Sequence, residues 1–324
     1  MKGFAVVVGF CAFLVHSAVF AEAPGDPLSW LGRIASAGHR LNYSGTFIYQ
    51  AGKNFETSRI AHLADPVGGE RERLEVLDGS PREVIRNNSE VRCVLPDQKM
   101  VIVDQPGGQR AFPSRLPVSF GGLAENYRIR KGEVGRVAGL DAQLIVLEPK
   151  DNLRYGHLLW AELQTGLLLK ARTVGEAGEI IEQFTFSDVK IGGEIGSEAL
   201  KPRYTGESDW RVVRAHGVEV AREDIGWSLS APLPGFALTS VVRRPLGRDR
   251  GEALHLVFSD GLAAVSVFIE PVGTSGARPG VVPMATGAVN MYKRIVAGHV
   301  VTALGEVPLE TVRRMGDGIE PAAR

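Results

Sequence analysis

The stretch that decides the fold runs from Tyr155 to Val189 and reads YGHLLWAELQTGLLLKARTVGEAGEIIEQFTFSDV. Alternating apolar and polar residues between turn signals predict three consecutive antiparallel strands, over Tyr155–Leu163, Leu167–Val174 and Glu179–Val189. Gly166 stands where a short hairpin loop needs a residue with positive φ, which glycine adopts without a Cβ clash. The stretch therefore predicts an antiparallel sheet with very short connections.

The third predicted strand has one apolar face. Successive side chains of a strand point to opposite faces, so every second residue lies on the same side. On one side of this strand lie Ile180, Glu182, Phe184 and Phe186, and the other side is largely polar. The apolar side must be covered by another part of the protein or by a ligand.

Upstream of this stretch the sequence predicts one helix and many strands. Asp26 and Pro27 are typical of a helix start, with Asp as N-cap and Pro at the first helical position. The helix should extend over Leu28–Leu41 with one apolar stripe. Strands separated by turn residues are then expected over Gly45–Gln50, Phe55–Leu63, Glu70–Leu77, Arg82–Asn87, Glu90–Leu95, Lys99–Asp104, Tyr127–Lys131, Gly132–Val137 and Gln143–Pro149.

The predicted domain organisation has four parts. Residues 1–21 have the basic start, apolar core and small residues of a cleaved signal peptide. Residues 22–202 form the sheet domain, and the polar segment 203–222 is interpreted as an interdomain linker. Residues 223–324 should form a smaller α+β domain, with a tight hairpin at Asp260-Gly261 and a helix over Pro308–Met315 that stops at Gly316. The fold class is therefore α+β, with mainly antiparallel β-structure.

Composition narrows the function classes. The chain has 324 residues, formal net charge zero and 44% hydrophobic residues, which are typical of a globular protein. A neutral, exported chain is not expected to bind nucleic acid. Once the signal peptide is removed, Cys93 is the one remaining cysteine, so no intramolecular disulfide is expected.

The sequence offers no catalytic or metal-binding pattern. No histidine has metal-ligand spacing to another histidine or cysteine, and no phosphate loop, dinucleotide fingerprint or nucleophile elbow occurs. We therefore predict a protein that is not an enzyme, with no catalytic residues, no cofactor and no metal.

Two groups of residues are candidates for binding. The first is the aromatic set of the sheet domain, which either packs on the predicted helix or lines an apolar cleft for lipid: Phe47, Tyr49, Tyr155, Trp160, Phe184 and Phe186. The second set, for a protein partner, combines a basic run and two strand phenylalanines: Arg243, Arg244, Arg248, Arg250, Phe258 and Phe268. The alternative for the basic run is a solvated hairpin loop.

Several segments resemble one known family when taken together and in order. They are WLGRIASAGHRLNYSGTFIYQ (Trp30–Gln50), RERLEVLDGSPREVIR (Arg71–Arg86), LEPKDNLRYGHLLWAELQTGLLLKA (Leu147–Ala171), LPGFALT (Leu233–Thr239), FSDGLAAVSVFIEPV (Phe258–Val272) and VTALGEVPLETVRRM (Val301–Met315). In these segments the mature chain resembles the RseB/MucB family of periplasmic regulators of the envelope-stress sigma factor.

The resemblance implies both a fold and a function. The first domain would be a curved half-barrel sheet with helices in its hollow, similar to the lipoprotein carriers LolA and LolB. The protein would bind the periplasmic part of a single-span membrane anti-sigma factor, protect it from site-1 proteolysis, and be released by lipid or lipopolysaccharide. It would act in the periplasm as a negative regulator and could form homo-oligomers. The alternative is a periplasmic lipid or lipoprotein carrier, which would not need the added second domain.

Overall fold

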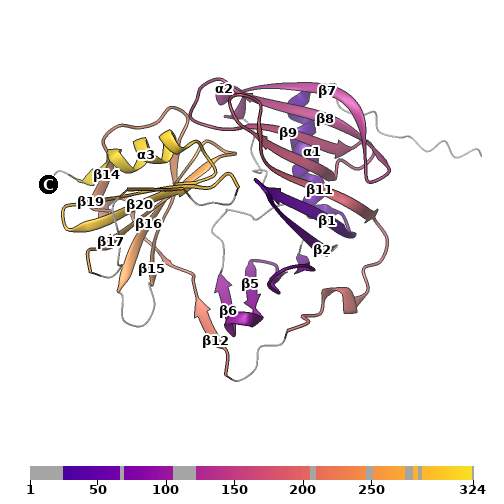
Figure 1. The fold of residues 1–324 in the computed structure, drawn as a ribbon, viewed down its shortest axis with the longest axis horizontal. Helices are drawn as coiled ribbons and strands as arrows, with labels where there is room; N and C mark the ends of the chain where they lie inside the picture. The colour runs from indigo at the N-terminus through magenta and orange to yellow at the C-terminus, as the bar shows by residue number, and fades with distance from the viewer. Residues whose placement is uncertain are drawn as a thin grey trace, which may run out of the picture.

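The computed structural model describes residues 25–65, 69–104, 122–204, 209–245, 251–273, 280–283 and 287–322. Two β-sheets make up most of the described chain, and they lie next to each other (Figure 1). We call the twelve-stranded sheet the N-terminal sheet and the seven-stranded sheet the C-terminal sheet.

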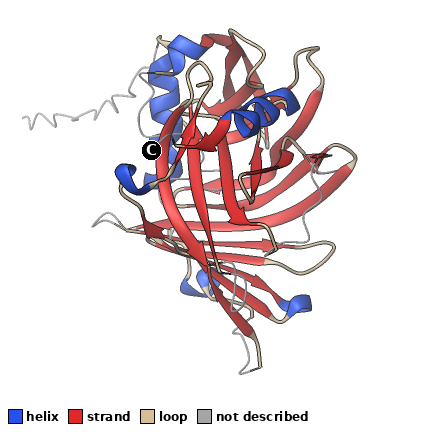
Figure 2. Cartoon of the chain, turned by 90° about the vertical axis from the view of Figure 1, so that its left-hand side faces the viewer, coloured by secondary structure: helices blue, strands red, loops and turns tan. Residues whose placement is uncertain are grey.

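The N-terminal sheet is an open meander in which β1 and β11 meet in the middle. The strand order is β12-β6-β5-β4-β3-β2-β1-β11-β10-β9-β8-β7, and every pair is antiparallel except β12 with β6. The strands curve strongly (Figure 2). Their bounds are β1 (Tyr43–Ala51), β2 (Asn54–Ala64), β3 (Glu70–Val76), β4 (Glu83–Asn87), β5 (Glu90–Leu95), β6 (Met100–Asp104), β7 (Tyr127–Val137), β8 (Leu140–Pro149), β9 (Gly156–Glu162), β10 (Leu168–Val174), β11 (Ile180–Ile191) and β12 (Arg211–Arg214).

Helix α1 (Pro27–Arg40) covers the apolar face of β7–β10. It begins as the sequence predicts, because the Asp26 carboxylate accepts a hydrogen bond from the Ser29 N–H at 2.9 Å. Trp30 and Leu31 are fully buried and pack in one cluster with Tyr127 and with Leu123 of α2 (Leu123–Asn126). Each such large apolar side chain contributes roughly 2–3 kcal/mol to stability, so α1 is held mainly by this packing.

The C-terminal sheet carries helix α3 (Leu309–Gly318) on one face. Its strand order is β13-β15-β16-β17-β20-β19-β18, and β14 pairs with β21 in a separate short ribbon. Val265 and Val267 of β17 and Val301 and Ala303 of β20 are fully buried and belong to one cluster with Val312 and Met315 of α3. The bounds are β13 (Val218–Glu219), β14 (Trp227–Leu229), β15 (Ala237–Pro245), β16 (Glu252–Ser259), β17 (Ala264–Pro271), β18 (Gly280–Pro283), β19 (Asn290–Val296), β20 (His299–Gly305) and β21 (Ile319–Pro321).

The predicted fold class is confirmed: the protein has an open, curved, mainly antiparallel sheet with a helix on one face, followed by a smaller α+β unit. Three local predictions differ from the structure. The strands expected over Tyr127–Lys131 and Gly132–Val137 form one strand, β7, with a register shift between Lys131 and Val134. Gly316 does not end α3, which continues to Gly318. Gly316 instead allows close packing, since a Cβ there would lie 2.6 Å from Cδ1 of Tyr292. The hairpin at Asp260 has four loop residues, because β16 ends at Ser259 and β17 begins at Ala264.

The segment interpreted as a linker contains regular structure. The short helical turns of the described chain are η1 (Pro96–Gln98), which connects β5 and β6, and η2 (Ser197–Leu200) and η3 (Arg222–Asp224), which lie before and after β12 and β13. Between η2 and η3, β12 adds to the N-terminal sheet and β13 adds to the C-terminal sheet. Both ends of this connection are therefore hydrogen-bonded to a sheet.

Candidate functional site at the junction of the two sheets

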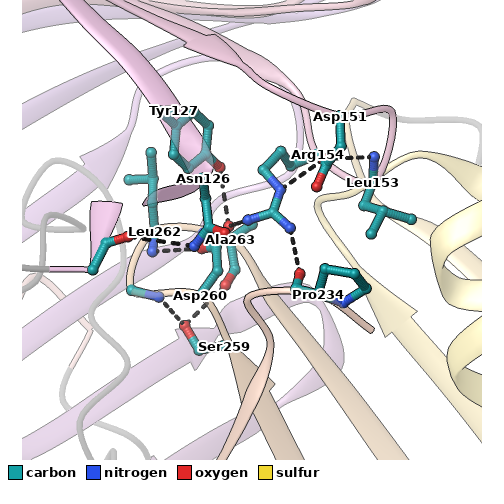
Figure 3. A network of polar contacts seen from close by, with 12 residues as sticks. Asn126, Tyr127, Asp151, Leu153, Arg154, Pro234, Ser259, Asp260, Leu262 and Ala263 are labelled. Atoms are coloured by element: carbon teal, nitrogen blue, oxygen red, sulfur yellow. Dashed lines mark hydrogen bonds and ion pairs between the residues drawn. The ribbon is translucent and has the colours of Figure 1, made fainter. Parts of the chain in front are cut away.

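A buried ion pair joins the two sheets. Arg154 lies in the loop between β8 and β9, and Asp260 lies in the β16–β17 loop (Figure 3). Arg154 Nη1 is 2.6 Å from Asp260 Oδ2, and both side chains are 0% exposed. The remaining guanidinium donors are also used, since Nη2 donates to the Pro234 carbonyl at 2.7 Å and Nε donates to Asp151 at 3.0 Å. All three guanidinium nitrogens therefore donate hydrogen bonds, and these fix the orientation of the group.

Both carboxylate oxygens of Asp260 also have hydrogen-bond partners. Its Oδ1 accepts backbone N–H groups of Leu262 at 2.9 Å and Ala263 at 2.7 Å, and Oδ2 accepts the Tyr127 hydroxyl at 3.3 Å. Burial raises the pKa of the Asp260 carboxyl, while these hydrogen bonds and Arg154 oppose that shift. Burial, followed by the neighbouring Asp260 carboxylate, also raises the pKa of Tyr127 well above its usual value. Tyr127 therefore stays a neutral donor.

Apolar side chains interlock around the ion pair. Leu153, next to Arg154, is 3% exposed and belongs to the core of the C-terminal sheet. Leu262, next to the Asp260 turn, packs against the core of the N-terminal sheet. Phe236 stacks on the guanidinium, with Arg154 Cζ 4.9 Å from the ring centroid. Each sheet thus inserts one leucine into the other, and water is kept away from the charges between them.

A second contact joins the end of β1 and the start of β11 to the loop before β19. Glu182 is buried and accepts the Tyr49 hydroxyl at 2.6 Å and the Ala288 N–H at 3.4 Å. Ala288 is 0% exposed, and Gly287 has φ of +79°. A Cβ on Gly287 would lie 3.0 Å from Glu182 Oε2, and the positive φ favours glycine, so any other residue here would be crowded and strained.

Two further hydrogen bonds extend this second contact. The Asn290 amide donates to the Tyr155 hydroxyl at 3.0 Å. The Thr311 hydroxyl of α3 donates to the Leu153 carbonyl at 2.8 Å. The β8–β9 loop therefore touches the hairpin, the strands and the helix of the C-terminal unit.

A third contact is centred on Arg244 of β15. Its Nη1 lies 3.4 Å from Asp104 at the end of β6 and also donates to the carbonyl of Ala215, which follows β12. Its Nε donates to Nδ1 of His255 at 3.0 Å. Burial, followed by the positive charge of Arg244, lowers the pKa of His255 to about 4, so the imidazole is neutral at pH 7 and accepts this bond. Arg244 thus connects both sheets and the segment between them.

Comparisons with known proteins identify the family. The family model for the MucB/RseB N-terminal domain matches residues 26–204, and that for the MucB/RseB C-terminal domain matches residues 221–320. The chain belongs to the MucB/RseB family.

Relatives agree with this assignment over nearly the whole chain. The sigma factor AlgU regulatory protein MucB of Pseudomonas aeruginosa is 33% identical over 312 residues, which cover 94% of each chain. The sigma-E factor regulatory protein RseB of Haemophilus influenzae is 24% identical and covers 88% of each chain. The solved structure of the Pseudomonas aeruginosa MucA/MucB complex matches with a TM-score of 0.71 at 31% identity, covering 93% of this chain and 100% of that chain. A crystal structure of MucB matches with a TM-score of 0.67 at 30% identity, covering 93% of this chain and 100% of that chain.

In this MucB/RseB family member, the aromatic residues singled out in the sequence separate into three places. Phe47 packs against Phe184 and Phe186, with ring centroids 4.9 and 6.0 Å away, and all three are buried under Ala37 of α1. Tyr49 and Tyr155 lie at the junction, where each makes the hydrogen bond given above. Trp160 is half-buried beneath Lys170 and Arg172, whose charged groups lie 4.9 and 5.5 Å from its ring.

Of the six residues predicted for a protein partner, the structure describes four, and these four lie in different places. Arg244 belongs to the junction, whereas Arg243 is exposed on β15. Phe258 is buried in the C-terminal core, and Phe268 is half-buried and stacks on His255 at 4.1 Å between ring centroids. Arg248 and Arg250 lie outside the described residues.

Tyr49, Tyr155 and Arg244 of the junction were candidates from the sequence, but the residues of the buried ion pair were not. Asp260 was noticed only as a turn residue, and Arg154, Glu182 and Gly287 carried no recognised signal. Charged residues are common in turns, so a charged turn residue on each side of a domain boundary does not identify a buried ion pair. Their importance depends on burial, which requires the folded structure.

A groove also lies on the N-terminal sheet. The groove has a volume of about 600 Å³ and lies on the face of β1, β2 and β11 opposite to the buried phenylalanines. Its lining includes Ser44, Thr46, Arg59, Asp188 and Lys190. Among the residues described, no three His, Cys, Asp or Glu side chains are placed to hold a metal, and no helix is long and apolar enough to cross a membrane.

Proposed function

We propose that this protein is a periplasmic negative regulator of an envelope-stress sigma factor. It would act by binding the periplasmic part of a single-span membrane anti-sigma factor. The observation that carries this proposal is the match, over 93% of the chain, to a relative whose structure was solved in complex with MucA. Relatives of this chain are named regulatory proteins of sigma factors, which supports a binding role over an enzymatic one.

We further propose that binding protects the anti-sigma factor from site-1 proteolysis and that lipid or lipopolysaccharide releases it. One ligand can release another only if each prefers a different state of the protein. Glu182, on the aromatic face of β1 and β11, accepts the Ala288 N–H of the C-terminal unit and the Tyr49 hydroxyl. A lipid chain entering that face would compete with this contact and so change the relative position of the sheets.

In this proposal the functional protein is the mature chain, from which residues 1–21 have been removed. Residues 22–202 would sense lipid, residues 203–222 would connect the domains, and residues 223–324 would contribute most of the partner surface. In the same proposal the protein also forms homo-oligomers.

Binding is tested by titrating the purified mature protein with the periplasmic part of the anti-sigma factor, using calorimetry. We expect a stable complex, slower cleavage of the anti-sigma segment by the site-1 protease when the complex forms, and loss of both effects on adding lipopolysaccharide. A mature protein that does not bind the segment would refute the regulatory proposal.

The alternative function is a lipid or lipoprotein carrier. Capture from detergent-solubilised envelope with the immobilised mature protein distinguishes the two. Recovery of lipoproteins without an anti-sigma factor would favour the carrier. Recovery of a single-span protein with a cytoplasmic sigma-binding domain would favour the regulator.

A further inference from the structure

A row of buried polar side chains crosses four strands beneath the end of α1. Tyr43 of β1 pairs with His62 of β2, and His62 pairs with Glu72 of β3. Glu72 in turn pairs with Arg86 of β4. Directly paired residues share one face of a sheet, so we call these four neighbours the polar row. Their exposed fractions are 0%, 1%, 6% and 7% in that order, and charged groups are rarely buried to this extent unless their charges balance.

The end of α1 rests on this row. His62 Nδ1 lies 2.8 Å from the carbonyl oxygen of Leu41, the C-cap residue of α1. His39, in the last turn of the helix, has its Nδ1 3.1 Å from Oε2 of Glu70. Glu70 lies two residues before Glu72 and therefore on the same face of β3. A change in the charge of the row therefore acts directly on the C-terminal turn of α1.

The geometry of His62 favours a second proton on its ring. A carbonyl oxygen can only accept a hydrogen bond, so Nδ1 carries the hydrogen that reaches Leu41. Nε2 has no hydrogen-bond partner among the described residues, and it lies 3.7 Å from Glu70 Oε2. An unprotonated Nε2 would place its lone pair beside a carboxylate, whereas a protonated Nε2 would attract that carboxylate. The buried ring is therefore more stable here as an imidazolium.

One proton balances the charges around the row. With neutral histidines, Arg86 supplies one positive charge, and Glu70 and Glu72 supply two negative charges, so one negative charge is left over. Tyr43 adds no charge, because burial, followed by the two carboxylates, raises the pKa of its hydroxyl well above the usual value. A proton on His62 makes the group neutral.

The pKa values in the row move toward proton uptake. Burial by itself lowers the pKa of His62, but two nearby carboxylates and the Leu41 carbonyl outweigh it, and the net shift is upward from 6.5. Burial also raises the pKa of Glu72, and His62 and Arg86 oppose this shift only in part. A group whose pKa is higher in the folded state stabilises that state at low pH, and this contribution is lost as the pH rises through the folded pKa.

We propose that the polar row is a proton-operated lock on the C-terminal turn of α1. The proton on His62 keeps the row neutral and the turn attached. Loss of this proton leaves a net negative charge beneath the helix C-terminus, which is itself the negative end of the helix dipole, and the turn loosens. Ala37, in the same turn, covers the buried phenylalanines of the N-terminal sheet, so loosening exposes their aromatic face. The lock is independent of the proposed function, although a lipid chain would reach this face more easily once the turn has loosened.

Two measurements on the wild-type mature chain test the lock. Nuclear magnetic resonance of the imidazole Cε1 signals gives the titration midpoint of His62, which should lie above the ordinary 6.5. Amide hydrogen exchange, corrected for the intrinsic effect of pH, gives the protection of the Leu41 amide, which donates to the Ala37 carbonyl at 3.2 Å. Between about pH 5.5 and about pH 9, this protection should fall about tenfold for each pH unit by which the midpoint exceeds 6.5. A midpoint below 6.5, or equal protection at both pH values, would overturn the inference.

A variant of Glu72 separates the lock from a packing effect. In Glu72→Gln the amide keeps the shape of the carboxylate without its charge, so the row is neutral without a bound proton. The titration midpoint of His62 should then fall below that of the wild type, and the pH dependence of Leu41 protection should shrink. The matched control is His216→Gln, at an exposed histidine, which should keep the wild-type behaviour. An unchanged His62 midpoint in folded Glu72→Gln would also overturn the inference, and if this variant does not fold, the two wild-type measurements decide.

Discussion

Removing one partner of the Arg154–Asp260 ion pair should cost about 3 kcal/mol of unfolding free energy. Breaking a buried pair in this way typically costs about 3–5 kcal/mol, because the remaining charge stays buried. In Asp260→Asn, the amide oxygen can still accept the N–H groups of Leu262 and Ala263. The loss is therefore concentrated on Arg154 Nη1, and we expect the lower end of that range.

The surface of the same protein provides the control. Arg130 and Glu148 approach within 2.7 Å, close to the 2.6 Å of the buried pair, but their side chains are 54% and 39% exposed. Such an exposed pair contributes at most about 1 kcal/mol. Glu148→Gln should therefore leave stability nearly unchanged, although the separation of its charged atoms is the same as that of the buried pair to within 0.1 Å.

Urea unfolding followed by tryptophan fluorescence measures these differences, with Asp260→Asn, Arg154→Met and the double variant compared. The double variant should be less destabilised than the sum of the single variants, because it leaves no unpaired charge. Amide hydrogen exchange at Leu262 and Ala263 reports on opening of the junction. A loss below about 1 kcal/mol for Asp260→Asn, or single effects that simply add, would show that the pair does not hold the two sheets together.

Three further predictions follow from individual contacts. Gly287→Ala should loosen the second contact by about 1–3 kcal/mol, because its Cβ would lie 3.0 Å from Glu182 and 3.3 Å from the Tyr49 hydroxyl. Gly298→Ala is the control, because Gly298 has a similar φ of +73° but no atom near its Cβ position, so this substitution introduces backbone strain alone. Equal amide hydrogen-exchange rates at Ala288 in the two variants would contradict the prediction. His255 has a folded pKa of about 4 against an ordinary 6.5, so the unfolded chain binds the proton first as the pH falls. Stability should therefore drop by roughly 3 kcal/mol between about pH 6.5 and pH 4, and a His255→Gln variant that keeps the same pH dependence of unfolding would refute this assignment. Gly316→Ala should destabilise α3, because the new Cβ would lie 2.6 Å from Tyr292. Gly32→Ala in α1 has no atom within 4 Å of the new Cβ and should stabilise the protein by about 1 kcal/mol. Thermal unfolding of the two variants tests the sign of each effect.

The sequence by itself determined the elements of the fold and much of their order. Strand alternation in Tyr155–Val189 is a local property, as is the helix start at Asp26, where the carboxylate needs only the N–H three residues later. The apolar face of β11 also followed from this alternation, and Phe184 and Phe186 are buried as that face requires.

Only the tertiary structure decided what the apolar and charged residues contact. Phe47 meets Phe184 because β1 pairs with β11, strands that are more than a hundred residues apart in the sequence. Arg154 and Asp260 are 106 positions apart, and nothing in either local sequence distinguishes a buried ion pair from two solvated turn residues. Burial depends on how two separately formed sheets pack, and a charge pattern within one segment contains no information about that packing.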